Sequence, residues 1–170
     1  MISRRNRIII IVASVVIAAL ATVFLLFFSH ATYLVLTDDL SGTHLRRVRM
    51  NGNKEFSIRF IHSVNISPVT EIFQIREGEI VLTALEFYTF GAGMPTEPQD
   101  GQTLIHLPEG GMRIDGFDRV MDGMRYSIGY DTEHTLRVGT RKIVLDTLES
   151  AGRRIRFDVE ILNLRQRMRA

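Results

Sequence analysis

The feature that most constrains this chain is an uninterrupted apolar run over residues 8–28. These 21 residues carry no charge, 15 of them are Ile, Val, Leu or Phe, and only Ser14 and Thr22 are polar. A helix of this length spans about 31 Å, which is enough to cross the hydrocarbon core of a bilayer. The run therefore predicts a transmembrane helix, and the lipid bilayer is the first partner that we expect, through residues 8–28.

The charges around this run predict its orientation. Arg4, Arg5 and Arg7 precede it, whereas the first Lys or Arg after it is Arg46. Because segments rich in Arg and Lys stay in the cytoplasm, we expect a cytoplasmic N-terminus and an extracytoplasmic remainder. In a bacterium this topology places a single-pass protein in the inner membrane with its domain in the periplasm.

A cleaved signal peptide is the alternative interpretation of the same segment. Ser29, His30 and Ala31 form a small-x-small triplet at which cleavage is conceivable, and the protein would then be secreted. The apolar run is longer than the roughly 7 to 15 residues of a signal-peptide core, which favours an uncleaved anchor. We therefore divide the chain into a stub and anchor (residues 1–30), an extracytoplasmic domain (31–164) and a basic, solvated C-terminal tail (165–170).

Composition excludes several classes of function. The chain has no Cys, so disulfide scaffolds, zinc fingers, iron–sulfur sites and cysteine nucleophiles are excluded. Three of the 21 Lys and Arg residues precede the apolar run, and the remaining 18 are balanced by 19 Asp and Glu. Without a basic stripe interleaved with aromatic residues, nucleic acid is not an expected partner. We expect no cofactor.

Beyond residue 30 the apolar residues recur with a period of two, which is typical of β-strands. Gly, Pro, Asn or Asp punctuates most of the gaps between these segments. The pattern predicts an all-β domain, an antiparallel sandwich or a partly closed barrel. We expect strands at residues 32–36, 55–64, 69–75, 80–90, 103–107, 111–114, 124–128, 135–138, 142–145 and 154–161.

Three consecutive predicted strands each place one ionisable residue on their apolar side. Side chains alternate between the faces of a strand, so residues of equal parity share a face. By this rule His62 shares a face with Phe60, Glu71 with Phe73, and Glu86 with apolar residues of the third strand. If Phe60 lies opposite Phe73, then His62 falls opposite Glu71, and Glu86 falls opposite or diagonal to Glu71. A bulge near Asn65 or Pro68 would break this register.

Two buried carboxylates beside a histidine need an explanation, because burying an unpaired charge is very unfavourable. The pattern leaves four hypotheses open: a structural His–Glu ion pair, a pocket for a small polar ligand, a divalent metal site and acid–base catalysis by two carboxylates. A metal-dependent enzyme is thus an alternative function. We favour a non-enzymatic site and assign no metal ligands or catalytic residues.

Two further features flank this region. Gly91 and Gly93 follow the third strand, and a Gly-x-Gly can expose backbone N–H groups to an anion or simply allow positive φ or close backbone approach. His134 begins an alternation with Leu136 and Val138, which predicts that it faces inward. Ser63 points away from His62 by parity, and no Gly-x-Ser-x-Gly motif is present, which argues against a serine hydrolase.

The ordered series His62-Ser63-Val64, Pro68-Val69-x-Glu71 and Phe90-Gly91-Ala92-Gly93-Met94-Pro95 resembles a bacterial family of unknown function. Members of that family are typically encoded beside, or fused to, the membrane permease of TAXI-type TRAP transporters, which import small organic anions. The resemblance extends over residues 56–94, with a weaker similarity at 134–138.

The resemblance implies an extracytoplasmic accessory or binding module of a solute transporter, with the permease and a small organic anion as partners. A purely structural envelope protein is a further alternative. The resemblance marks positions without assigning them roles. Together with the parity argument, it gives the candidate ligand-binding residues His62, Ser63, Glu71, Glu86, Gly91, Gly93 and His134.

Overall fold

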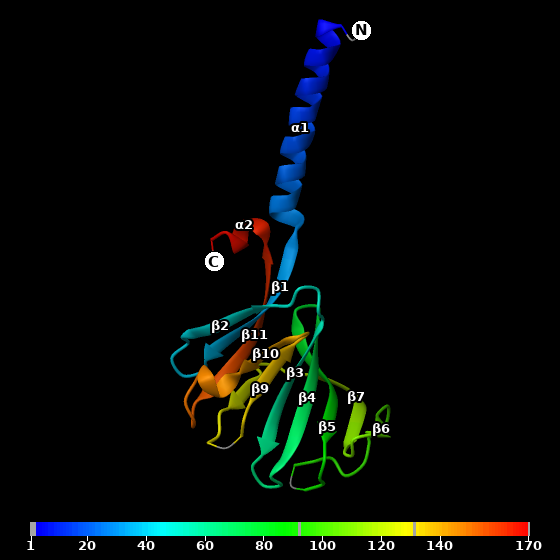
Figure 1. Ribbon diagram of the computed structural model, residues 1–170, viewed down its shortest axis with the longest axis vertical. Coiled ribbons are helices and arrows are strands. Elements are labelled where there is room, and N and C mark those ends of the chain that lie inside the picture. The colour runs from blue at the N-terminus through cyan, green and yellow to red at the C-terminus, as the bar shows by residue number, and fades with distance from the viewer. Residues whose placement is uncertain (1–2, 92, 131, 170) are drawn as a thin grey trace. The chain divides into compact units, whose positions relative to one another are not determined.

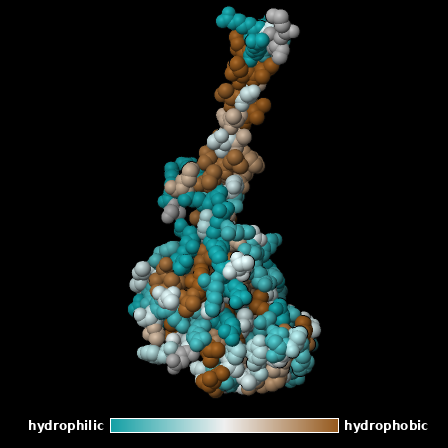
Figure 2. All heavy atoms as spheres, viewed as in Figure 1, coloured by the Kyte–Doolittle hydropathy of each residue, from teal (hydrophilic) through white to brown (hydrophobic). Residues whose placement is uncertain are grey.

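The computed structural model describes residues 3–91, 93–130 and 132–169. It begins with helix α1 (Arg4–Phe28), whose N-terminus is capped by the Ser3 side chain accepting a hydrogen bond from the Asn6 N–H (3.3 Å). Within the described residues, α1 is the one helix long and apolar enough to cross a membrane. Apolar side chains cover most of its surface (Figure 2). The prediction of an apolar N-terminal helix is confirmed.

The C-terminal residues begin as a helical turn, which the sequence did not lead us to expect. Helix α2 (Leu164–Arg167) starts with a capping box, in which Asn163 and Gln166 each accept a hydrogen bond from the other's backbone N–H. The guanidinium of Arg167 donates to the backbone oxygen of Ser29 (3.1 Å). Part of the predicted solvated tail therefore contacts the end of α1.

The chain divides into two compact units, which we describe separately. One contains α1 and α2, with the residues up to Thr32 and from Ile161 onward. The other, from Tyr33 to Glu160, contains nearly all of the β-structure and every candidate site residue.

The β-structure forms two antiparallel sheets (Figure 1). The four-stranded sheet has the order β2 (His44–Arg49), β1 (His30–Asp38), β11 (Arg154–Asn163), β8 (Arg125–Ser127). The seven-stranded sheet has the order β10 (Arg141–Val144), β9 (Thr135–Val138), β3 (Glu55–His62), β4 (Ser67–Arg76), β5 (Glu79–Phe87), β7 (Met112–Val120), β6 (Thr103–His106). A 3-10 turn, η1 (Leu145–Thr147), follows β10.

The two sheets share one main hydrophobic core. Leu34 and Leu36 of β1 pack in it with Phe56 and Ile58 of β3, and all four are at most 2% exposed. A second, smaller cluster of buried residues lies beside β4, β5 and β7: Val69, Leu85, Phe87 and Ile114. The face of the seven-stranded sheet toward the core is thus apolar, and we call the opposite face its outer face.

The predicted all-β fold is confirmed, and every predicted strand overlaps an observed one. Strand β2 was not predicted. Its sequence, HLRRVR, has two apolar residues spaced three apart, so it shows no period of two. Basic side chains of this kind are typical of edge strands, where they oppose pairing with other chains.

Candidate functional site

The register between β3 and β4 differs from the prediction. His62 pairs with Ser67, and Glu71 pairs with Ile58, four residues further from the turn than expected. The turn is tight, because the Ile66 N–H donates to the His62 carbonyl (2.8 Å) and β4 begins at once. His62 and Glu71 therefore do not face each other, and the predicted pairing of these two residues is wrong.

His62 instead organises the β3–β4 turn. Its Nδ1 accepts hydrogen bonds from the backbone N–H groups of Val64 (3.3 Å) and Asn65 (3.4 Å). An accepting Nδ1 leaves Nε2 as the ring nitrogen that carries the proton. Ser63 is exposed within the same turn.

Gly91 lies against this turn. A Cβ atom at Gly91 would come within 2.1 Å of the Asn65 side-chain oxygen, so any other residue here would require the Asn65 side chain to move. Gly93 has φ +83°, a conformation that favours glycine. Close approach and positive φ thus account for the two glycines, while Ala92 between them lies outside the described residues. The structure brings His62, Ser63 and Gly91 to one end of the sheet.

Glu71 lies on the core side of β4, as its parity predicted, and bridges the two sheets. Its carboxylate accepts a hydrogen bond from the hydroxyl of Tyr126 on β8 of the four-stranded sheet. Burial raises the pKa of Glu71 to about 7, an effect that the positive charge of Arg119 partly opposes. The carboxyl group therefore changes charge near neutral pH.

His134 packs on the same tyrosine. Its ring lies 5.9 Å from the Tyr126 ring and stacks on Phe60 at 5.4 Å, measured between centroids. His134 is 4% exposed, its Nδ1 lies 2.9 Å from the Thr132 hydroxyl, and burial lowers its pKa despite nearby Asp146. The expectation that His134 faces inward is correct, and the structure gathers it with Glu71 around Tyr126.

Glu86 lies on the outer face, away from Glu71. Strand β5 contains a bulge: Phe73 pairs with Leu82 but Ile72 pairs with Ala84, so Thr83 is an extra residue. One extra residue inverts the parity of everything beyond it. Glu86 consequently pairs with Thr70, and its predicted position on the apolar face is wrong.

His62, Glu71 and Glu86 therefore occupy three separate places: a turn, the interior and the outer face. Within residues 3–91, 93–130 and 132–169, no group of three or more His, Asp or Glu side chains is placed to hold a metal ion. The three-residue cluster on which the metal and acid–base hypotheses depended does not form.

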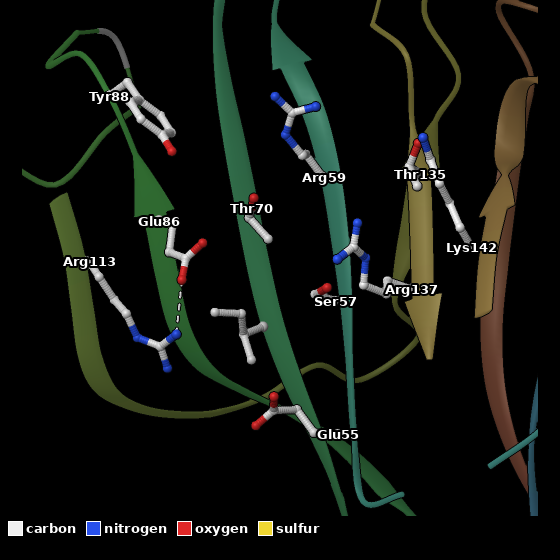
Figure 3. Close-up of a pocket in the computed structure, with 11 residues that line it drawn as sticks. Glu55, Ser57, Arg59, Thr70, Glu86, Tyr88, Arg113, Thr135, Arg137 and Lys142 are labelled. Carbon is white, nitrogen blue, oxygen red and sulfur yellow. Dashed lines mark hydrogen bonds and ion pairs between the residues drawn. The ribbon is translucent and has the colours of Figure 1, made fainter. Parts of the chain in front are cut away.

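The outer face around Glu86 forms a polar groove of about 400 Å³ (Figure 3). Cross-strand pairing aligns its side chains in two rows. One row contains Thr135, Arg59, Thr70, Glu86 and Arg113, and the other contains Lys142, Arg137, Ser57 and Ile72. We call this the outer-face groove; Glu55 and Tyr88 complete its lining. Its volume falls in the range of small-molecule sites.

Short residues form the floor of the groove, and long charged side chains form its walls. Thr70 and Ser57 lie on the central strands β4 and β3, and the side chains of Arg59 on β3 and Arg137 on β9 lie beside them (Figure 3). No carboxylate lies within 4 Å of Arg59, Arg137 or Lys142 in the part of the chain that the structure describes. These three cations are therefore available to an anion.

Sequence reasoning found only Glu86 of this groove, because it followed the apolar face of each strand. The signal for the rest was the opposite parity. Ser57 and Arg59 alternate with core residues on β3, and Thr135 and Arg137 do so on β9. Polar residues at such positions are usually read as solvated, and only the strand order places these two pairs side by side.

The fold and the groove define a class of protein: a β-sandwich domain that follows an apolar N-terminal helix and bears a polar, cation-rich groove on one sheet. A family described as "Domain of unknown function (DUF1850)" matches residues 56–145, more than half of the chain. The chain belongs to this family. The matched segment runs from β3 to η1 and contains every residue of the groove except Glu55. No curated protein and no solved structure matches the chain.

Proposed function

We propose that this protein is a membrane-anchored, extracytoplasmic binding module that holds a small organic anion in the outer-face groove. The observation that carries the proposal is the presence of three cations, Arg59, Arg137 and Lys142, without a carboxylate partner among the described residues, in the lining of a groove large enough for a small molecule. Guanidinium groups bind carboxylates through paired, charge-assisted hydrogen bonds. The floor hydroxyls of Thr70 and Ser57 supply further polar contacts.

The N-terminal helix supports the proposed membrane orientation. Arg4, Arg5 and Arg7 lie at the start of helix α1, ahead of its apolar run, and this charge distribution favours a cytoplasmic N-terminus with the β-domain exported, into the periplasm in a bacterium. A tether of this kind keeps a binding domain close to a membrane partner and raises its effective concentration there.

We further propose that this partner is a solute permease of the TRAP type. The proposal is based on the resemblance carried by residues 56–94, which is to domains encoded beside TAXI-type permeases. In that setting the module contributes to the handling of an organic anion on its way to the permease. The His62 turn, which contains part of that motif, lies at an end of the sheet apart from the groove.

Anion binding is tested with the full chain purified in detergent. Sodium salts of a panel of mono- and dicarboxylates are titrated by calorimetry against sodium chloride of equal ionic strength. We expect saturable binding, and at least a tenfold loss of affinity in Arg59→Gln or Arg137→Gln, because each removes a charged hydrogen-bonding group worth about 1.5–3 kcal/mol.

Arg46→Gln is the matched control. Arg46 is an exposed arginine outside the groove, so its loss changes net charge equally without altering the proposed site. Equal weakening in Arg46→Gln and Arg59→Gln would show that only net charge matters and would refute the site. Absence of saturable binding with every carboxylate would refute anion binding.

The permease is tested separately in native membranes. A tagged full-length chain is solubilised and purified, and co-purification of a TRAP-type permease is expected. A version carrying an unrelated transmembrane helix in place of residues 4–28 controls for association through the anchor alone. Recovery of the tagged chain without any permease would contradict the transporter assignment while leaving the anion site untouched.

A further inference from the structure

The outer-face groove is electrostatically asymmetric. Its β3–β9–β10 side carries three cations, Arg59, Arg137 and Lys142, against one carboxylate, Glu55. On the β5–β7 side, Arg113 is already bound by two carboxylates, donating to Glu86 (2.9 Å) and Asp115 (2.8 Å). That side therefore has a net negative charge, although it contains an arginine.

Glu86 has capacity left for a ligand. Its Oε1 accepts the hydrogen bond from Arg113, and the residues that the structure describes provide no partner for its second oxygen. In Figure 3 this second oxygen points toward Thr70 and the middle of the groove. An ionised carboxylate accepts several hydrogen bonds, so Glu86 can hold a donor while it remains paired to Arg113.

The spacing between the two sides suits one small molecule. Arg59 and Glu86 flank Thr70 in the same cross-strand row, so their Cα atoms are two strand spacings, or about 10 Å, apart. The shorter Thr70 lies between these two side chains, and the structure places no ion pair between them. The gap that remains over Thr70 faces a cation on one side and a carboxylate on the other.

We propose that the ligand is zwitterionic, an α-amino acid whose carboxylate binds Arg59 and Arg137 and whose ammonium group binds Glu86 above Thr70. This inference rests on the proposed anion-binding function and specifies its ligand class. A second carboxylate at the β5–β7 side would instead meet Glu86 and Asp115, with Arg113 already paired to both, and like charges at this distance repel.

The experiment compares ligands that differ only by the α-ammonium group. Calorimetry on the full chain at pH 7 uses three pairs: L-alanine with propionate, L-aspartate with succinate, and L-leucine with 4-methylpentanoate. We expect the amino acid to bind at least tenfold more tightly than its deaminated partner in at least one pair. Blocking the amine of the preferred amino acid by N-acetylation should abolish the advantage in the wild-type chain.

Substitutions in the groove test whether Glu86 causes the preference for the amino acid over its deaminated partner. Glu86→Gln should reduce the affinity ratio of the preferred pair to about one, chiefly by weakening binding of the amino acid. Glu55→Gln, which neutralises the other carboxylate lining the groove, should keep the ratio. If Glu86→Gln does not fold, the N-acetylated ligand still decides the question in the wild-type protein.

The outcomes separate the two proposals. Equal affinity within all three pairs, or an undiminished preference after N-acetylation, overturns the zwitterion while anion binding stands. Loss of both members of a pair in folded Glu86→Gln also overturns it, because Glu86 would then act only by positioning Arg113. If none of the acids or amino acids shows saturable binding, the proposed anion site is overturned as well.

Discussion

Glu71 and Glu86 lie on neighbouring strands, yet the seven-stranded sheet places them in opposite environments. Glu71 faces the core, where burial raises its pKa to about 7, and its carboxylate accepts a hydrogen bond from the Tyr126 hydroxyl. Glu86 faces the outer side and is paired with Arg113. The comparison shows that the face of a strand decides the chemistry of a carboxylate, since solvation and charge partners differ across a single sheet.

The largest expected effect is a difference between the inner and outer faces of the seven-stranded sheet. Truncating an aromatic side chain should lower the free energy of unfolding much more on the inner face than on the outer face. Phe73 is fully buried and stacks on Phe56 at a centroid distance of 5.2 Å, so Phe73→Ala should lower the free energy of unfolding by about 3–5 kcal/mol. Tyr88→Ala removes an aromatic side chain from the outer-face groove, where the residue is 40% exposed, and should cost about 1 kcal/mol or less. Urea unfolding monitored by circular dichroism measures both changes. Similar losses in the two variants would contradict the assignment of an inner and an outer face.

Glu71 should make the free energy of unfolding depend on pH. Its pKa is about 7 in the folded protein against an ordinary value of 4.5 in the unfolded chain, so between these values the folded state binds a proton that the unfolded state has lost. The free energy of unfolding therefore falls as pH rises through this window, by about 3 kcal/mol at most. Glu71→Gln cannot titrate, so its stability relative to wild type should rise from pH 4.5 to pH 8.

Measuring the difference between wild type and variant at each pH isolates this effect. His134, whose pKa is lowered by burial, contributes an opposite trend at acidic pH, but it does so equally in both proteins. Glu86→Gln is the control on the other face, because it makes the same substitution at a carboxylate that is paired with Arg113. A flat difference for Glu71→Gln would mean that Glu71 titrates normally.

The sequence predicted the positions of the strands better than the register in which they pair. Strict alternation identified β3, β4 and β9, because a half-buried strand must place apolar residues on one side. The same rule correctly placed Glu71 and His134 inside. It failed for Glu86 because residues 81–82 and 84–85 are all apolar, so either parity reads as a core face and the bulge at Thr83 leaves no trace in the pattern.

The register and the groove depend on information that one sequence does not display. Residues 63–66 were compatible with a wider corner, and the His62–Ile66 hydrogen bond that closes the turn is visible only in the structure. The outer-face groove needs the strand order β10-β9-β3-β4-β5-β7, which joins Arg137 and Arg59 to Glu86 across long stretches of chain. Local periodicity assigns faces but does not say which strands are neighbours.

The smallest expected change in the free energy of unfolding comes from the hydrogen bond between Tyr126 and Glu71, which links the two sheets. Tyr126→Phe keeps the ring packing on Phe60, His134 and Phe157 and removes only the hydroxyl. A hydrogen bond to a charged acceptor is worth more than one to a neutral acceptor, so the variant should lose about 1 kcal/mol at pH 5 and about 2 kcal/mol at pH 8.

The double variant Tyr126→Phe, Glu71→Gln shows whether the two side chains act as a pair. If they do, the effects of the single substitutions on the free energy of unfolding at pH 8 should not add, because the hydroxyl has no carboxylate partner once Glu71 is an amide. Additive effects, or a loss in Tyr126→Phe that is the same at both pH values, would show that the hydroxyl does not bind the ionised carboxylate. The contrast between Glu71 and Glu86 would then rest on burial alone.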